Sequence, residues 1–302
     1  MVHWIAPGPA PRRGEYQKNL NEAVNSFDIN HLVDQIAQTK ARWLIFTVGQ
    51  NTGYYASPNQ YLDSLAGPGH TPERDLVLEL AKALAKIGVR FIAYLPGEIK
   101  AVTSLHQVFG WNPDDQREFQ RKYTTFIREY SERYGSLCSG WWIDGCYNWR
   151  AFPNSARDWP LWTSALRAGN PQAALAFNDG CFLVKHPYPL TPGQDFLSGE
   201  SDGLDPTGPL AKDKGRPELI RLTAEFLDQL PCVGHVLAPI DDNGRWGHRG
   251  PGEIAPPLYS RDQMESTISS YSRLGIGLTM NVGIYQEGAI GDSTLKLLSQ
   301  LR

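Results

Sequence analysis

Two short segments of this sequence each carry a carboxylate at a place where it could do chemistry. In residues 140–145 an apolar run ends at Asp144, and a glycine follows it. In residues 195–200 an acidic segment runs from Asp195 to Glu200. Paired carboxylates with aromatic neighbours are the groups that glycoside hydrolysis needs. One carboxylate attacks or stabilises the anomeric carbon, the other transfers a proton, and aromatic faces stack on sugar C–H surfaces.

Each segment also has a purely structural interpretation. A strand-terminal aspartate such as Asp144 is well suited to capping the loop or helix that follows its strand. The segment 195–200 has the composition of an acidic loop in contact with solvent. Spacing alone leaves these interpretations open.

Composition and charge exclude several classes of protein. The chain has 302 residues, with 29 Lys and Arg against 32 Asp and Glu, so its formal charge is −3. A nucleic-acid-binding protein would be expected to show a basic face. Hydrophobic residues make up 41% of the chain, but no uncharged apolar run approaches the roughly 18 residues of a membrane span. We therefore expect no nucleic-acid partner and no membrane insertion.

The sequence carries no signature of a bound cofactor or metal. The glycine patterns of dinucleotide-binding and P-loop proteins are absent. The four cysteines, at positions 138, 146, 181 and 232, include no Cys-x-x-Cys pair and are too few for a disulfide framework in a chain of this length. We expect four free thiols, no metal site and no cofactor.

The N-terminal residues do not predict a cellular compartment. Residues 1–13 lack a charged segment followed by an apolar one, so no signal peptide is expected. The protein would be cytoplasmic if the chain is full length, and periplasmic or secreted if a leader has been removed.

Short apolar runs alternate with longer segments of helical period, which is typical of βα units around a parallel sheet. The expected strands are residues 2–5, 43–47, 89–95, 139–143 and 173–177, a short strand near 195, and residues 233–238 and 276–282. The expected helices are residues 28–40, one starting at Thr71 and Pro72 and stopped by Gly88, one over 119–134 ended by Gly135, residues 157–168, 218–230 and 261–274 with a capping box of Ser260 and Gln263, and one from Ser293. About eight such units predict an α/β fold of the (β/α)₈ TIM-barrel type, in a single domain over residues 1–302.

In a barrel the loops after the strands converge on one pocket. The polar and aromatic residues expected there are His3, Trp4, Thr47, Gln50, Asn51, Glu98, Asp144, Asn178, Asp179, Asp195, Glu200, Asp241, Asp242 and Asn281. Carboxylates dominate this set, which favours the acid–base chemistry described above.

The order of these segments resembles the α-L-fucosidases of glycoside hydrolase family 29, across essentially the whole chain. A family strand that ends Trp-x-Asp-Gly delivers the nucleophile, and it matches Trp142, Asp144 and Gly145. A family segment Asp-Phe-x-Ser/Thr-x-Glu matches residues 195–200, and its Glu is the acid/base in some members. The resemblance implies that Asp144 is the nucleophile and that Glu200 is the acid/base.

Further stretches extend the resemblance and imply contacts with substrate. Residues 3–4 resemble the His-Trp of the family's first strand, whose His contacts fucose, and residues 245–248 look like its Ser-Trp-Gly-Tyr stretch. Residues 277–283 are similar to its Gly-Asn-Leu-Leu-Leu-Asn-Val-Gly-Pro. The residues expected to contact substrate are His3, Trp4, Gln50, Asn51, Tyr54, Glu98, Trp142, Asn178 and Trp246.

The sequence also departs from the family. Where the family has His-His after its second strand, this chain has Gln50 and Asn51. Amides donate and accept hydrogen bonds but carry no charge near neutral pH, so this exchange could redirect sugar preference. The family usually adds a C-terminal β-sandwich domain, which is not expected within these residues.

The sequence thus predicts a retaining exo-glycosidase that releases a terminal α-L-fucosyl or closely related sugar from an oligosaccharide or glycoconjugate. Its oligomeric state is open. One alternative is the same chemistry on another sugar, such as an α-L-galactoside. The other is a non-catalytic carbohydrate-binding barrel, motivated by the lost histidines.

Overall fold

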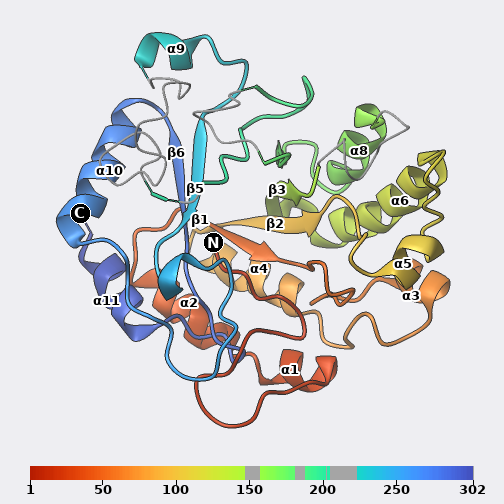
Figure 1. The fold of residues 1–302 in the computed structure, drawn as a ribbon, viewed down its shortest axis with the longest axis horizontal. Coiled ribbons are helices and arrows are strands. Elements are labelled where there is room, and N and C mark those ends of the chain that lie inside the picture. Colours follow the sequence, from red (N-terminus) through yellow and green to blue (C-terminus); the bar gives the residue numbers. More distant parts are fainter. Residues whose placement is uncertain (147–156, 181–187, 202, 205–222, 302) are drawn as a thin grey trace.

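In this computed structural model, parallel strands lie at the centre and helices lie around their outside (Figure 1). The structure describes residues 1–302 except 147–156, 181–187, 202, 205–222 and 302. The strands in the described ranges are β1 (Trp43–Thr47), β2 (Arg90–Pro96), β3 (Cys138–Asp144), β4 (Ala174–Phe177), β5 (His235–Pro239) and β6 (Gly277–Asn281). The α-helices are α1 (Leu20–Ser26), α2 (Ile29–Ala37), α3 (Gln60–Ala66), α4 (Leu76–Lys86), α5 (Thr103–Val108), α6 (Arg117–Tyr134), α8 (Trp159–Leu166), α9 (Ala224–Asp228), α10 (Arg261–Arg273) and α11 (Asp292–Gln300).

The strands form two parallel sheets in the described part of the chain. The first has the order β1-β2-β3-β4, and the second pairs β5 with β6. The register places Tyr94 of β2 opposite Trp142 of β3, and Pro96 opposite Asp144. Because parallel strands end at the same edge, the residues that follow them gather there. The predicted α/β class with parallel strands is confirmed.

Backbone contacts link the two sheets on both sides. On one side, Val2 forms parallel bridges to Phe46 of β1 and to Val282, which follows β6. On the other side, the carbonyl of Gly199 accepts a hydrogen bond from Leu237 of β5, and the amides of residues 195 and 196 donate to the carbonyl of Leu175 in β4. The expected strands at residues 2–5 and near residue 195 are therefore present as isolated bridges.

The strands are buried on both faces, as expected for a parallel sheet covered by helices. One face of successive strands forms a small apolar cluster of Ile45, Tyr94, Trp142, Ala176 and Leu237, together with Met1. The alternate residues, such as Phe46, Trp141 and Leu175, belong to the larger core that includes the helices. The alternation puts Tyr94 and Trp142 on the face that leads to Asp144.

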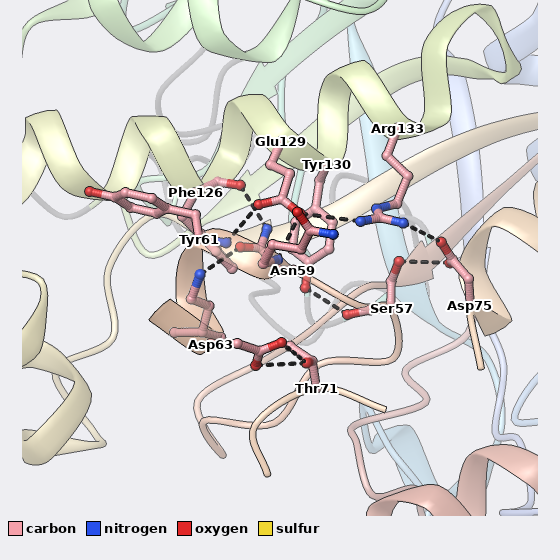
Figure 2. Close-up of polar contacts among 12 residues, drawn as sticks. Ser57, Asn59, Tyr61, Asp63, Thr71, Asp75, Phe126, Glu129, Tyr130 and Arg133 are labelled. Atoms are coloured by element: carbon pink, nitrogen blue, oxygen red, sulfur yellow. Dashed lines mark hydrogen bonds and ion pairs between the residues drawn. The ribbon is translucent and has the colours of Figure 1, made fainter. Parts of the chain in front are cut away.

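A polar network fixes the segment after β1 against α6 (Figure 2). The carboxylate of Glu129 accepts hydrogen bonds of 2.8 Å from the backbone amides of residues 60 and 61, which start α3. Arg133 bridges Glu129, at 3.2 Å, and Asp75, at 3.5 Å. The Ser57 hydroxyl donates to Asp75, and the Tyr130 hydroxyl donates to the Ser57 carbonyl. This network anchors residues 57–61, between β1 and the start of α3, against α6.

The start of α4 differs from the expected one. The helix was expected to start at Thr71 and Pro72, but its N-cap is Asp75, whose carboxylate accepts a hydrogen bond from the backbone of Leu78. The Thr71 hydroxyl donates to the carboxylate of Asp63 instead, at 2.9 Å. An aspartate three residues before a free helical amide is the stronger cap, so the helix begins later.

The other helices follow the predicted pattern with shifted ends. The capping box of Ser260 and Gln263 is present on α10, and Gly135 ends α6 in a left-handed conformation. The helix expected over 157–168 is α8, which is shorter. The helix expected over 218–230 is seen as α9, and residues 218–222 lie outside the described residues.

Two further expectations concern the cysteines and insertion into a membrane. Cys138, Cys146 and Cys232 are free thiols, and Cys181 lies outside the described residues. Of the helices that the structure describes, none has both the length and the apolar character needed to cross a membrane.

Candidate active site

A cavity of about 870 Å³ lies at the carboxyl ends of the strands. Asp144 and Glu200 both line it, together with the rings of Trp142 and Trp246. Residues 5–14 and residues 246–249 form parts of its walls. This volume falls in the range of small-molecule binding sites, and a few polar groups in an apolar wall are typical of them.

Asp144 is the last residue of β3 and accepts three hydrogen bonds. Its Oδ1 accepts from the backbone of Gly145 and from the side chain of Asn178, both at 2.8 Å. Its Oδ2 accepts from the hydroxyl of Tyr94. Three donors hold this carboxylate in one orientation and stabilise its negative charge.

Tyr94 is a residue that sequence reasoning missed. Its ring stacks on Trp142 with centroids 5.2 Å apart, and it lines the cavity. Burial, and next the negative charge of Asp144, raise the pKa of Tyr94 well above its ordinary value, so the phenol stays protonated. A signal was available, since Tyr94 is a polar-tipped aromatic in an apolar strand, two residues before the strand end and on its inward face.

Asn178, fully buried after β4, joins the two carboxylates. Its Oδ1 accepts a hydrogen bond of 3.0 Å from the backbone of Gly180, which fixes the orientation of the amide. Its Nδ2 then donates to Asp144 at 2.8 Å and to Glu200 at 2.5 Å. An amide nitrogen has two hydrogens, and both are used here. Asn178 was expected to bind a sugar hydroxyl, and in this structure both hydrogens of its amide nitrogen are directed at the two carboxylates.

Glu200 is placed by the close approach of its segment to β5. It forms a parallel bridge with Leu237, and Gly199 before it has φ +64°. A Cβ on Gly199 would lie 1.9 Å from the carbonyl oxygen of His235, so only glycine fits. The indole of Trp142 donates to the carbonyl of Ser198 in the same segment, at 3.2 Å.

His3 lies at the cavity wall in a defined neutral form. Asn281 donates its Nδ2 hydrogen to the carbonyl of Trp246 at 3.0 Å, which turns its Oδ1 toward His3 at 2.9 Å. His3 therefore carries its proton on Nδ1. Burial lowers the pKa of His3 to about 4, so the ring is neutral at pH 7 and its Nε2 can accept a hydrogen bond.

Gln50 and Asn51 both line the cavity, as expected. The Oε1 of Gln50 accepts a hydrogen bond of 3.0 Å from the backbone of Asn51. The Nε2 of Gln50 donates to the hydroxyl of Tyr94.

Three of the expected substrate-binding residues lie elsewhere. Trp4 is fully buried in the core, where it stacks on Phe46 and donates to the carbonyl of Gln286. Tyr54 is 39% exposed and does not line the cavity in the part of the chain that the structure describes. Glu98 lines a neighbouring cavity of about 470 Å³, which shares Asn51 and Asp144 with the main one. Successive residues of an extended segment point to opposite sides, so Trp4 packs in the core with the helices while its neighbour His3 faces the cavity.

Other strand-end carboxylates have structural roles. Asp195 forms an ion pair of 2.6 Å with Arg167 and accepts a backbone hydrogen bond from Leu175. Asp241 accepts hydrogen bonds from the backbone of Gly283 and the hydroxyl of Thr294, and burial raises its pKa to about 6. Among the described residues, no three His, Cys, Asp or Glu side chains are grouped as metal ligands.

Comparisons with known proteins identify the fold. No protein-family model and no curated protein matches the sequence. Among solved structures, the endo-fucoidan hydrolase P5AFcnA from glycoside hydrolase family 107 has a TM-score of 0.67 at 14% identity, over 99% of this chain and 89% of that one. The family 107 endo-fucoidan hydrolase MfFcnA4 has a TM-score of 0.65 at 17% identity, over 99% of this chain. This chain spans about half the length of MfFcnA4, 51%.

The α-L-fucosidase AlfC from Lactobacillus casei, in complex with α-L-fucose, is also similar. Its TM-score is 0.57 at 16% identity, over 93% of this chain and 80% of that one. The likeness therefore extends to family 107 hydrolases as well as to a fucosidase, and it does not single out family 29. At these identities the likeness concerns the fold, and this chain has the fold of these glycoside hydrolases.

Proposed function

We propose that this protein is a retaining glycoside hydrolase that cleaves the bond of an α-L-fucosyl or closely related sugar. One observation carries the proposal: the buried amide of Asn178 holds the carboxylates of Asp144 and Glu200 together at the floor of a cavity. The fold shared with fucosidase and fucoidan hydrolase structures supports this substrate class.

The spacing of the carboxylates supports retention of configuration. The two oxygens bound by Asn178 are separated by at most the sum of its two hydrogen bonds, about 5.3 Å, while retaining glycosidases hold their carboxyl groups about 5–5.5 Å apart and inverting ones about 6.5–9.5 Å. An inverting enzyme needs the larger gap for a water molecule. The short separation favours direct attack by one carboxylate.

In the proposed mechanism Asp144 attacks the anomeric carbon and Glu200 protonates the oxygen of the leaving group. The C–O bond to the leaving group breaks as the bond to Asp144 forms. Glu200 then removes a proton from water, which attacks the glycosyl-enzyme and releases Asp144. The three donors to Asp144 suit it to carry the charge at the start and end of this cycle.

The walls of the cavity supply groups for a sugar ring. Trp246 offers an apolar face on which sugar C–H groups can stack, while Trp142, 2% exposed and stacked on Tyr94, contributes a small part of the wall. The Nε2 of neutral His3 can accept from a hydroxyl, and the exposed Asn51 can donate and accept. Because these groups are neutral, they suit uncharged hydroxyls of the glycone.

We also infer that the parallel elements close into the predicted (β/α)₈ barrel, and that residues 1–302 form one catalytic domain. The bridges of Val2 to Phe46 and Val282 support closure on one side. The contacts of residues 195–200 with β4 and β5 support it on the other. With residues 2 and 195–200 counted as short strands, the order of eight is continuous.

Endo-action on a fucose-containing polymer is a second candidate. It is favoured because the family 107 endo-fucoidan hydrolase structures match this fold with TM-scores of 0.65–0.67, against 0.56–0.60 for the AlfC structures. Exo-action predicts release of single sugars, and endo-action predicts release of oligosaccharides.

A panel of substrates tests the proposal. Purified protein is incubated with aryl α-L-fucoside, aryl α-L-galactoside, other aryl glycosides and fucoidan, and the first product is followed by NMR and by chromatography. The expected result is hydrolysis of a fucosyl or galactosyl substrate with an initial α-configured product. An initial β-product would contradict retention. Sugar binding in calorimetry without hydrolysis of any substrate would favour the non-catalytic alternative.

A further inference from the structure

We infer that Gln50 is a positioning residue that acts through Tyr94: its amide directs the phenolic hydrogen of Tyr94 onto Asp144. This inference rests on the proposed role of Asp144 as nucleophile. It replaces the expectation that Gln50 binds a sugar hydroxyl.

The direction of each hydrogen bond follows from a backbone group. The backbone N–H of Asn51 can only donate, so the side-chain atom of Gln50 that lies 3.0 Å from it is the carbonyl oxygen Oε1. The other end of the Gln50 amide, Nε2, therefore faces the hydroxyl of Tyr94. An amide nitrogen donates and does not accept, so the Tyr94 oxygen is the acceptor in this bond.

The remaining hydrogen bond of Tyr94 is then determined. Its oxygen already accepts from Gln50, and its own hydrogen points to the Oδ2 of Asp144. The phenol is fully buried and its pKa is raised well above the ordinary value, so it is protonated and able to donate at neutral pH. A series of hydrogen bonds, called the relay here, therefore runs from the backbone of Asn51 through Gln50 and Tyr94 to Asp144.

The ring of Tyr94 has little freedom to choose another partner. It stacks on Trp142 with an interplanar angle of 13°, and His3 meets it edge-on at 5.2 Å. Of the two Asp144 oxygens, Oδ1 accepts hydrogen bonds from Gly145 and Asn178, and Oδ2 accepts the one from Tyr94. The phenol thus controls the orientation of the less constrained oxygen.

The substitution Gln50→Glu tests the direction of the relay with almost no change of shape. A glutamate carboxylate accepts hydrogen bonds from both Asn51 and Tyr94, so the Tyr94 hydrogen turns away from Asp144. The substitution Tyr94→Phe removes the donor and keeps the ring. Each single variant is expected to lower kcat by about ten- to a hundredfold, the effect of one hydrogen bond to a charged group, with KM nearly unchanged.

The double variant separates this role from sugar binding. If Gln50 acts through Tyr94, Gln50→Glu in the Tyr94→Phe background costs less than about threefold, because the relay is already broken. The same background also measures the through-space effect of the added charge. A loss from Gln50→Glu that is as large in this background as in the wild type, or a loss confined to KM, overturns the inference.

A second measurement does not depend on catalysis. The buried hydroxyl hydrogen of Tyr94 is expected as a downfield proton NMR resonance that Tyr94→Phe removes. The substitution Asp144→Asn is expected to move it, because the acceptor loses its charge. If the wild type hydrolyses no glycoside while this resonance responds to Asp144→Asn, the proposed function fails and the hydrogen-bond relay stands. If Asp144→Asn leaves the chemical shift of this resonance unchanged, the relay is contradicted.

Discussion

The side-chain amide of Asn178 donates a 2.8 Å hydrogen bond to Oδ1 of Asp144, and neither group is free to turn. The amide is fixed by the backbone of Gly180, and the carboxylate is fixed by two further donors. This bond ties the end of β4 to the end of β3, and the same nitrogen reaches Glu200. Asn178 therefore links the two carboxylates directly.

Asn178→Ala is expected to lower kcat/KM by about a hundredfold, because misplacing a catalytic group by an ångström costs about that much. Kinetics on the best aryl glycoside of the panel measure it. Asn170→Ala is a matched control, since the side chain of Asn170 also donates a hydrogen bond to β3, but to the backbone carbonyl of Cys138 at the other end of the strand. The control should lose stability and keep its activity. Equal activity in the two variants would remove Asn178 from the site.

Asp144→Gly should abolish turnover, and azide should restore part of it by entering the space of the missing nucleophile. The product of the rescued reaction should be a glycosyl azide of inverted configuration, read by NMR. Activity close to that of the wild type without azide would exclude Asp144 as the nucleophile.

Glu200→Gln should slow substrates with poor leaving groups far more than activated aryl glycosides, because only the former need a proton on the departing oxygen. Rates across a series of aryl leaving groups measure this. Asp195→Asn, in the same segment but paired with Arg167, should reduce stability without any dependence on leaving group. If Glu200→Gln affects all substrates equally, another residue is the acid, and Glu98 is the next to examine.

Acid should destabilise the protein through His235. Its ring is buried between the carbonyl of Ser198 and the hydroxyl of Thr279, and burial lowers its pKa from 6.5 to about 4. A histidine with a lowered folded pKa contributes its full stability above pH 6.5 and loses it as the pH falls toward 4, because the unfolded chain takes up the proton first. The free energy of unfolding that is lost through His235 over this pH range is about 3 kcal/mol, from 1.36 kcal/mol per pKa unit.

Urea unfolding at pH 7 and pH 4 of the wild type and of His235→Gln measures this contribution. The advantage of the wild type should shrink by about 3 kcal/mol between the two pH values. The difference between the proteins cancels the titration of other groups. An advantage that does not change with pH would show that His235 has the same pKa in both states.

Gly199→Ala should destabilise the protein by more than about 3 kcal/mol, through a clash that no rotamer relieves. Its Cβ would lie 1.9 Å from the carbonyl oxygen of His235. Gly67→Ala is the control, since Gly67 has a similar positive φ of 81° but nothing within 4 Å of the added carbon. With ψ 174° it lies in a region essentially confined to glycine, so Gly67→Ala should cost about 1–3 kcal/mol of backbone strain without the added clash. Equal losses in denaturant unfolding would show that conformation, and not contact, explains Gly199.

The alternation of short apolar runs and helical segments was sufficient to predict most of the elements. Residues 43–47 are β1 as predicted, and the capping box of Ser260 and Gln263 starts α10. These features depend on local periodicity and on hydrogen bonds within a few residues, so the local sequence determines them. The predicted start of α4 was wrong because Thr71 and Asp75 were both possible N-caps. The hydroxyl of Thr71 donates instead to Asp63, which lies in another helix, α3.

The sequence also indicated which residue types form the site, but it did not determine the role of each residue. The strand-end rule placed Asp144, Glu200, Asn178 and Gln50 together. Hydrogen bonds join Asn178 to both carboxylates, and they join Gln50 to Asp144 through Tyr94. The rule could not separate Glu200 from Asp195, whose partner Arg167 lies in another element. Nor could it separate His3 from its neighbour Trp4, because which face of a chain points inward depends on strand pairing.

What only the tertiary structure decided is the direction of the hydrogen bonds. Tyr94 lies inside an apolar strand, and it meets Asp144 because the parallel register brings β2 and β3 side by side. Backbone amides fix the orientation of two side chains, so that the nitrogen of Gln50 faces Tyr94 and the nitrogen of Asn178 faces the carboxylates. These orientations are the basis of the positioning roles proposed for both residues. Sequence determines which donors and acceptors exist, and the fold determines which of them already have partners.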